Sequence, residues 1–381
     1  MFLYIYNIQI LQDFFLNLPN NKITPNISTE ILANSRSMKF HTNLEDYNCA
    51  PLVSLKSLAK ELKINNLFIK DESQRFGLNA FKVLGASYAV YHLLNHESNI
   101  TTFCTATDGN HGRAVAWSAR KENKKCIVYV PEDTTKLRMN AIANEGAKVY
   151  KLEMNYEKTC EFAKKMSLEN NWTLIQDTSW NNYEEIPSLI MSGYLTHFIE
   201  LENQINLNYN SKIDIIFLQC GVGSWPASCV WYFLNKYKAD RPKIVTVEPI
   251  ESAGIFESFN LGSRSSPNGN YKTIMAGLNC GIPSKNGWDI IKNGCDASII
   301  ISDDYVIKAM NKYYYPKDND VRIISGESGA AGLAGLLKVI SDSTFDRLRK
   351  HINLNSSSNV LLFNTEGATD INDFNKIIKL N

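Results

Sequence analysis

Lys82 stands where a helix is expected to begin, which is an unusual place for a cation. The run 75–82, RFGLNAFK, separates a strand-like segment at 67–70 from a helix-like segment at 83–94. The positive end of the helix dipole faces such a lysine, so an ordinary surface lysine gains nothing there. A lysine held as a neutral imine avoids this penalty. For this stretch alone, a lysine whose stem packs on a buried turn while its amine reaches water is the more frequent explanation.

The residues that precede Lys82 bear on its reactivity. Four of them are apolar: Phe76, Leu78, Ala80 and Phe81. If they enclose the amine, they lower its pKa, as an amine nucleophile requires. The functional interpretation therefore depends on whether other segments supply partners for a reactive lysine.

A second candidate is the run 107–112, TDGNHG, directly after an expected strand at 102–106. Ligands of open α/β sheets bind at such strand ends, where the first turn of the next helix offers free N–H groups. Asn110 can donate to or accept from a ring oxygen, and Asp108 adds a carboxylate. A tight turn explains the two glycines but not Asp, Asn and His together.

A third candidate is the run 219–224, QCGVGS, which follows the most apolar expected strand, 213–218. Backbone N–H groups in such a loop can form a nest for a phosphate. It is not a dinucleotide fingerprint, because Pro226 stands where the third glycine would be, and the chain has no GxxxxGK[ST] motif. By itself the loop fits a structural turn as well as a phosphate site.

Two further small-residue junctions follow, at 325–332 (SGESGAAG) and at 364–370 (NTEGATD). The second ends the last expected strand and offers the hydroxyl of Thr365. Small residues at helix starts usually serve close packing, which favours the structural explanation for the first. His92 and His96 have helical spacing but lack the glutamate and third ligand of a zinc site.

Elements that must position these junctions follow a strand-then-helix pattern. The expected strands are 67–70, 102–106, 126–130, 148–152, 174–176, 213–218, 243–247, 298–301 and 360–363. Short apolar runs without alternation indicate strands buried on both faces, which predicts an α/β protein with mainly parallel sheets. We also expect helices at 52–62 and 186–206, and a surface loop at 260–272 that is rich in Gly, Ser, Asn and Pro.

Composition excludes several classes of protein. The 381 residues carry 40 Lys and Arg against 39 Asp and Glu, a net charge of +1, so no basic stripe for nucleic acid is expected. The eight cysteines show no CxxC pair, which fits reduced thiols in a cytoplasmic protein. Residues 1–21 fit neither a signal peptide nor a membrane span and form an extension of unknown role, and no membrane association is expected.

Taken together, the junctions resemble those of fold-type II pyridoxal phosphate enzymes, the tryptophan synthase β-like family. The similar phrases run in family order from about residue 50 to 370: RFGLNAFKVLGASYA, TDGNHGRAVAW, QDTSW, TIMAGLNCG, SGESGAAGL and NTEGATD. Within this family they are most similar to diaminopropionate ammonia-lyases. Threonine dehydratases share the plan, but resemble the chain less around Lys82 and usually carry a small residue where Asp108 stands.

The resemblance implies a role for each junction. Lys82 would be the Schiff-base lysine with Phe81 beside the cofactor, and Asn110 would contact the phenolic oxygen. Thr365 would face the pyridine nitrogen. The phosphate would lie on Gly221, Val222, Gly223 and Ser224, although Trp225, Pro226 and Ser228 depart from the smaller residues usual in that loop. Asp108 and Asp177 would act on the substrate.

The resemblance also implies an organisation and an activity. A large cofactor domain would comprise residues 22–85 and 207–381, a small domain residues 86–206, with pyridoxal 5'-phosphate between them and a homodimer as the assembly. The substrate would be 2,3-diaminopropionate, converted to pyruvate and two ammonia molecules by loss of the Cα proton and β-elimination. Alternatives are a serine or threonine dehydratase and a homologue that binds the cofactor without turnover.

Overall fold

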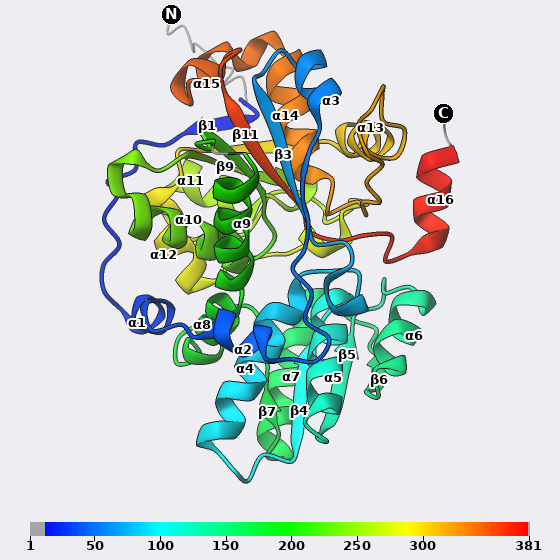
Figure 1. Cartoon of the computed structure of the whole chain (residues 1–381). Helices are drawn as coiled ribbons and strands as arrows, with labels where there is room; N and C mark the ends of the chain where they lie inside the picture. The colour runs from blue at the N-terminus through cyan, green and yellow to red at the C-terminus, as the bar shows by residue number, and fades with distance from the viewer. Residues whose placement is uncertain (1–11, 210, 380–381) are drawn as a thin grey trace, which may run out of the picture.

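Two sheets organise the chain, and the computed structural model describes residues 12–209 and 211–379 (Figure 1). The large sheet, in the upper half of Figure 1, has the strand order β1-β10-β9-β8-β11-β3-β2. Its bounds are β1 Phe14–Leu16, β2 Leu52–Ser54, β3 Asn66–Asp71, β8 Ile215–Gln219, β9 Lys243–Pro249, β10 Ala297–Ile301 and β11 Asn359–Asn364. Its inner strands are parallel, and β1 and β2 pair antiparallel at the two edges.

A smaller sheet lies in the lower half of Figure 1, with the order β6-β5-β4-β7 and parallel pairing throughout. Its bounds are β4 Thr102–Ala106, β5 Lys125–Val130, β6 Lys148–Lys151 and β7 Thr173–Leu174. The α/β class with mainly parallel sheets is thus confirmed. Each of the nine expected strands overlaps a strand of one of the two sheets, although β6 is mostly exposed, and β1 and β2 were not expected.

Helices cover both sheets, and many begin where a strand has just ended. Their bounds are α1 Ile27–Ala33, α2 Ser37–Thr42, α3 Lys56–Glu61, α4 Lys82–His96, α5 Asn110–Lys121, α6 Lys136–Asn144, α7 Tyr156–Glu169, α8 Glu185–Gly193, α9 Leu195–Asn208, α10 Ser224–Tyr237, α11 Gly254–Leu261, α12 Lys285–Gly294, α13 Asp303–Tyr314, α14 Ala331–Ser341, α15 Asp346–His351 and α16 Ile371–Lys379. Helix α4 begins at Lys82, as expected. The central strands β8 and β11 are almost wholly buried, which explains their unbroken apolar sequence.

Several expectations about elements were wrong. Residues 52–62 form strand β2 and helix α3 instead of one helix, because the run Leu52–Ser54 pairs with β3. Residues 186–206 form two helices that meet at Tyr194. The junction at 325–332 is not preceded by a strand in the described chain.

The N-terminal segment also differs from a free extension. Residues 14–16 form β1, which pairs with β10, and Asp13 Oδ2 accepts a 2.6 Å hydrogen bond from Lys338 Nζ. Residues 1–11, which hold most of the apolar run at the terminus, lie outside the described residues. Within the described ranges no helix combines the length and apolarity needed to cross a membrane. The cysteines are all free thiols.

Candidate active site

Strand ends from both sheets meet at one cavity. Every residue predicted for the site lines it: Phe81, Lys82, Asp108, Asn110, Asp177, Gly221, Val222, Gly223, Ser224 and Thr365. Tertiary structure therefore brings together the five candidate runs, 75–82, 107–112, 219–224, 325–332 and 364–370, which lie far apart in the sequence. The physical reason is that parallel strands present their carboxyl ends at one edge of a sheet.

The turn that carries Lys82 is held by the last junction of the chain. Ala80 and Glu366 form an isolated antiparallel bridge, and the Phe81 N–H donates to the Thr365 carbonyl at 3.2 Å. The Gly367 N–H donates to the Asn79 carbonyl at 2.9 Å. Lys82 and Thr365 are thereby fixed to one another through the backbone, before any ligand is considered.

Lys82 faces a carboxylate. Its Nζ donates to Asp177 Oδ2 at 2.6 Å, and its side chain is 21% exposed, so the amine remains accessible from the cavity. Burial acts to lower the pKa of Lys82, but the Asp177 carboxylate and the Tyr194 hydroxyl group outweigh it, and the pKa lies above its usual value. The expected lowering by the apolar neighbours is therefore wrong for this state, because the ion pair dominates.

Asp177 also faces a histidine that the sequence placed in the second junction without a role. His111 Nδ1 lies 3.8 Å from Asp177 Oδ2, while His111 Nε2 donates to the Ile175 carbonyl at 2.9 Å. Burial lowers the pKa of His111. Burial raises the pKa of Asp177, but the charges of His111 and Lys82 outweigh it and hold the value at about 2. Asp177 is a carboxylate at neutral pH.

Asp108 is the second carboxyl group in the cavity and has a different electrostatic environment. Burial raises the pKa of Asp108 to about 6, against the opposing charges of Arg138 and Lys82. Two carboxyl groups with pKa values separated in this way can perform different tasks at one pH. Asp177 is committed to the lysine, whereas no hydrogen bond within the described chain occupies the Asp108 carboxyl oxygens.

The loop after β8 has the features of a phosphate cradle. Gly223 has a left-handed backbone (φ 91°) and caps helix α10. Within residues 12–209 and 211–379 no hydrogen bond occupies the N–H groups of Gly221, Val222, Gly223 and Ser224. A Cβ on Gly221 would lie 3.1 Å from Cys280 Sγ and 3.2 Å from the Gly277 carbonyl oxygen, so a side chain there would be crowded. Free N–H groups at a helix start suit a phosphate.

Thr365 directly follows β11 and accepts a hydrogen bond from Gln219 Nε2 at 3.0 Å through its Oγ1. The same amide donates to the Phe363 carbonyl at 2.8 Å, which fixes its orientation. Thr365 places a neutral hydroxyl group on the cavity wall, which fits a pyridine nitrogen that stays unprotonated.

Some cavity residues were not found by sequence reasoning. Glu366 accepts hydrogen bonds from Asn110 Nδ2 and, at 3.1 Å, from the Ser328 N–H, so it links three junctions. Arg138 and Tyr156 also line the cavity. Glu366 follows Thr365 in the run 364–370, and this position is the only feature of the sequence that could have indicated a role for it. Arg138 and Tyr156 carry no local signal, because α6 and α7 approach the site only through folding.

These features define a pocket for a phosphate-bearing cofactor beside a lysine, and the comparisons with known proteins agree. A model of the family described as pyridoxal-phosphate dependent enzyme matches residues 44–362, and the chain belongs to this family. Its fold is that of the fold-type II members, and its cofactor is pyridoxal 5'-phosphate. The free N–H groups and the crowded glycine of the loop after β8 fit that cofactor's phosphate.

Individual relatives show which members of the family the chain is similar to. A diaminopropionate ammonia-lyase of Salmonella typhimurium is 36% identical over 377 residues, covering 93% of this chain and 92% of the relative. The crystal structure of diaminopropionate ammonia-lyase from Escherichia coli in complex with an aminoacrylate-PLP azomethine reaction intermediate superimposes with a TM-score of 0.88 at 33% identity, covering 96% of both chains. A biosynthetic L-threonine dehydratase of Haemophilus influenzae is 27% identical over 303 residues, covering 78% of this chain and 54% of the relative.

Proposed function

We propose that this enzyme converts 2,3-diaminopropionate to pyruvate and two ammonia molecules. The observation that carries the proposal is the pair of carboxyl groups, Asp108 and Asp177, in the cavity that holds Lys82. A diamino acid presents a second ammonium group, and a carboxylate beside it both selects that substrate and keeps the leaving ammonia protonated. The similarity in sequence and fold to diaminopropionate ammonia-lyases supports the same assignment.

Pyridoxal 5'-phosphate supplies an electron sink when bound, and the protein orients the substrate and moves protons. We assign Lys82 to the covalent link with the cofactor and then, as a free amine, to removal of the Cα proton. Asp177, 2.6 Å from Lys82 Nζ, holds the lysine in place and balances its positive charge. Asp108 faces the β-ammonium group. The N–H groups of Gly221–Ser224 bind the phosphate, Asn110 the phenolic oxygen, and Thr365 the pyridine nitrogen.

Three further assignments belong to the same proposal. We place the enzyme in the cytoplasm as a homodimer. We divide it into a large domain of residues 22–85 and 207–381 and a small domain of residues 86–206. In support of the division, strands β4 to β7 of the small sheet fall within 86–206, and all strands of the large sheet except β1 fall within the other two segments.

The proposal is tested by substrate turnover. Purified enzyme is supplied with 2,3-diaminopropionate, serine or threonine at equal concentrations, and pyruvate or the corresponding oxo acid is measured. Diaminopropionate should be turned over with the highest kcat/KM. Turnover of serine or threonine alone would show a dehydratase, and cofactor binding without any turnover would show a homologue that has lost catalysis.

The role of Lys82 is tested separately. Lys82→Ala should abolish the yellow colour of the purified protein and its activity, because the covalent link to the cofactor is lost. Lys148→Ala, which alters an exposed lysine at the start of β6, is the matched control and should keep both. Retention of the colour by Lys82→Ala would contradict the assignment.

A further inference from the structure

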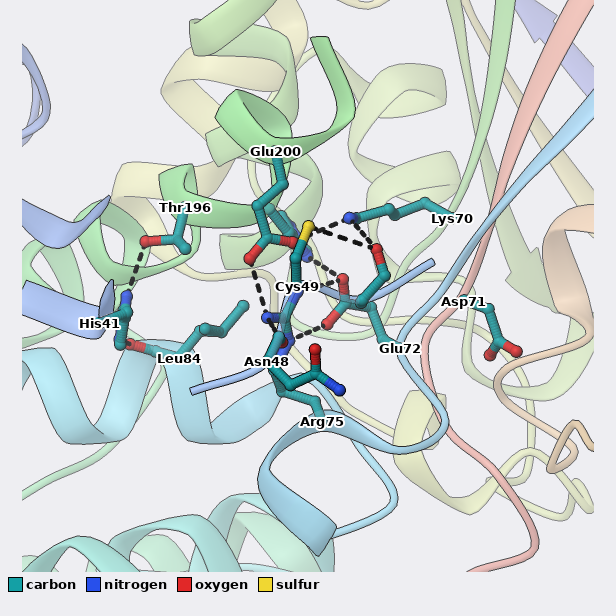
Figure 2. Close-up of polar contacts among 12 residues, drawn as sticks. His41, Asn48, Cys49, Lys70, Asp71, Glu72, Arg75, Leu84, Thr196 and Glu200 are labelled. Carbon is teal, nitrogen blue, oxygen red and sulfur yellow. Dashed lines mark hydrogen bonds and ion pairs between the residues drawn. The ribbon is translucent and has the colours of Figure 1, made fainter. Parts of the chain in front are cut away.

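Outside the residues that line the cavity, the protein contains a buried network of charged side chains (Figure 2). Figure 2 shows Lys70, Glu72, Arg75 and Glu200 pointing toward one another, and all four are at most 2% exposed. Arg75 donates to Glu72 Oε2 at 2.7 Å and to Glu200 Oε2 at 2.6 Å, and Lys70 Nζ donates to Glu200 Oε2 at 2.8 Å. Two cations face two carboxylates, so the network is balanced internally.

This network reaches the cavity through one histidine. His197 Nδ1 lies 3.4 Å from Glu72 Oε1, and His197 Nε2 accepts a hydrogen bond from Trp225 Nε1 at 2.9 Å. An indole N–H can only donate, so His197 Nε2 must be unprotonated. The proton of the neutral ring is then on Nδ1, which lies beside Glu72 at 3.4 Å but makes no hydrogen bond within the described chain. The tautomer that accepts from Trp225 therefore places the ring N–H on the side of the charge network.

Trp225 lies between three parts of the cofactor pocket. It follows Ser224 directly, in the first turn of α10, and lines the cavity. Its ring centroid lies 5.4 Å from that of Phe81, the residue before Lys82, and 5.1 Å from that of Phe363 at the end of β11. One rigid side chain therefore touches the lysine turn, the β11 end and the phosphate loop.

The contacts of Trp225 give this large side chain a structural role between the phosphate loop and the lysine turn. We propose that Trp225 is a positioning residue that sets the phosphate loop relative to the Lys82 turn, and that it does so because buried His197 accepts a hydrogen bond from its indole N–H. The inference rests on the proposed assignment of Lys82 and Gly221–Ser224 to the cofactor. A loop held in this way keeps its free N–H groups at a fixed distance from the lysine.

The test measures how tightly the full-length apoenzyme binds pyridoxal 5'-phosphate. Trp225→Phe keeps an aromatic ring but removes the N–H, and His197→Leu removes the acceptor. Each should raise the dissociation constant about tenfold, the equivalent of losing one hydrogen bond of ordinary strength. Both should also shift the phosphorus-31 resonance of the bound cofactor, which reports the surroundings of the phosphate. His197→Gln restores an acceptor for the indole and should restore both values toward wild type.

A matched control separates positioning from packing. Trp231→Phe makes the same substitution on the same helix, at a buried tryptophan that does not line the cavity and whose N–H has no hydrogen-bond partner within the described chain. It should leave the dissociation constant and the phosphorus resonance unchanged. If Trp225→Phe lowers only the thermal midpoint of the apoenzyme and leaves both cofactor readouts unchanged, the inference is wrong.

The Lys82→Ala variant distinguishes an error in the assignment of Lys82 from an error in the role of Trp225. A Lys82→Ala protein that keeps the visible absorbance of the covalently bound cofactor would refute the assignment of Lys82, whatever the Trp225 variants show. If Lys82→Ala loses that absorbance while Trp225→Phe matches Trp231→Phe in both readouts, the assignment of Lys82 stands and the role of Trp225 falls.

Discussion

Arg75 offers the sharpest test of the buried network, because a single substitution removes the one of its two cations that contacts both carboxylates. The guanidinium makes two hydrogen bonds to Glu72, at 2.7 and 2.9 Å, and two to Glu200, at 2.6 and 2.9 Å. It also donates to the Asn48 carbonyl at 2.9 Å. Arg75→Met keeps much of the side-chain volume but leaves Glu72 buried without a strong cationic partner. Glu200 keeps Lys70.

The expected loss follows from burial. Removing one partner of a buried ion pair destabilises a protein by about 3–5 kcal/mol, because the remaining charge is uncompensated. Arg75 is 2% exposed, so solvent does not screen the interaction. We therefore expect Arg75→Met to lower the free energy of unfolding by about 3–5 kcal/mol at neutral pH. The comparison is Arg347→Met, an exposed arginine without an ion pair in the described chain, which should cost less than about 0.5 kcal/mol.

The loss of unfolding free energy in Arg75→Met should depend on pH. Burial alone would raise the pKa of Glu72 and of Glu200, but Arg75 outweighs it, and both pKa values lie below the usual value. In the wild type the two carboxylates therefore contribute stability above their unfolded pKa, and this contribution is lost as the pH falls through the folded pKa. In Arg75→Met, burial raises the pKa of Glu72 in the folded state. The folded variant therefore binds a proton as the pH falls, which reduces its loss of stability relative to the wild type.

The assay is urea denaturation of the apoenzyme, followed by fluorescence and circular dichroism, between about pH 8 and about pH 5. The difference in unfolding free energy between wild type and Arg75→Met should be largest near pH 8 and should shrink toward pH 5, since protonation relieves the unpaired carboxylate. A difference below about 1 kcal/mol at pH 8, less than the cost of one net hydrogen bond of ordinary strength, would refute the reasoning. So would a difference that does not change with pH.

Two other predictions concern the cavity and the packing behind it. We propose that Asp108 removes the Cα proton of the enantiomer that presents it on the face opposite to Lys82; Asp108→Asn should then impair this enantiomer of 2,3-diaminopropionate more than the other, by about 10²–10⁴ in kcat/KM. Because the pKa of Asp108 is about 6, wild-type activity on that enantiomer should fall as the pH drops through this value. The activity of Asp108→Asn should not show this fall. Equal losses on both enantiomers would count against Asp108 as the base. Gly193→Ala should lower the unfolding free energy by about 1–3 kcal/mol in urea titrations, because its Cβ would lie 2.3 Å from the backbone oxygen of Leu84. Ser192→Ala, one residue earlier, removes a buried hydroxyl group without a partner in the described chain and should cost far less; similar losses in the two variants would refute the steric explanation.

Local sequence was sufficient for the elements that are long and buried on both faces. The expected strands 102–106 and 360–363 match β4 and the centre of β11, because unbroken apolar runs between polar turns have few other solutions. The segment 52–62 was misread as a helix, since short apolar runs are ambiguous between helix and strand. The pairing of Leu52–Ser54 with β3 makes this segment a strand, and the sequence around it does not show that pairing.

By itself the sequence determined the α/β class and the positions of the candidate runs, because each run is a contiguous phrase, and the cofactor followed from the resemblance of these phrases to a known family. The distances between these phrases were decided only by the tertiary structure. Lys82 meets Asp177 across 95 residues of sequence, and Trp225 meets His197 across 28, so neither pair has a periodic or local signal. The charge of Lys82 was misjudged for this reason: apolar sequence neighbours suggested a lowered pKa, whereas a carboxylate brought from another segment raises it.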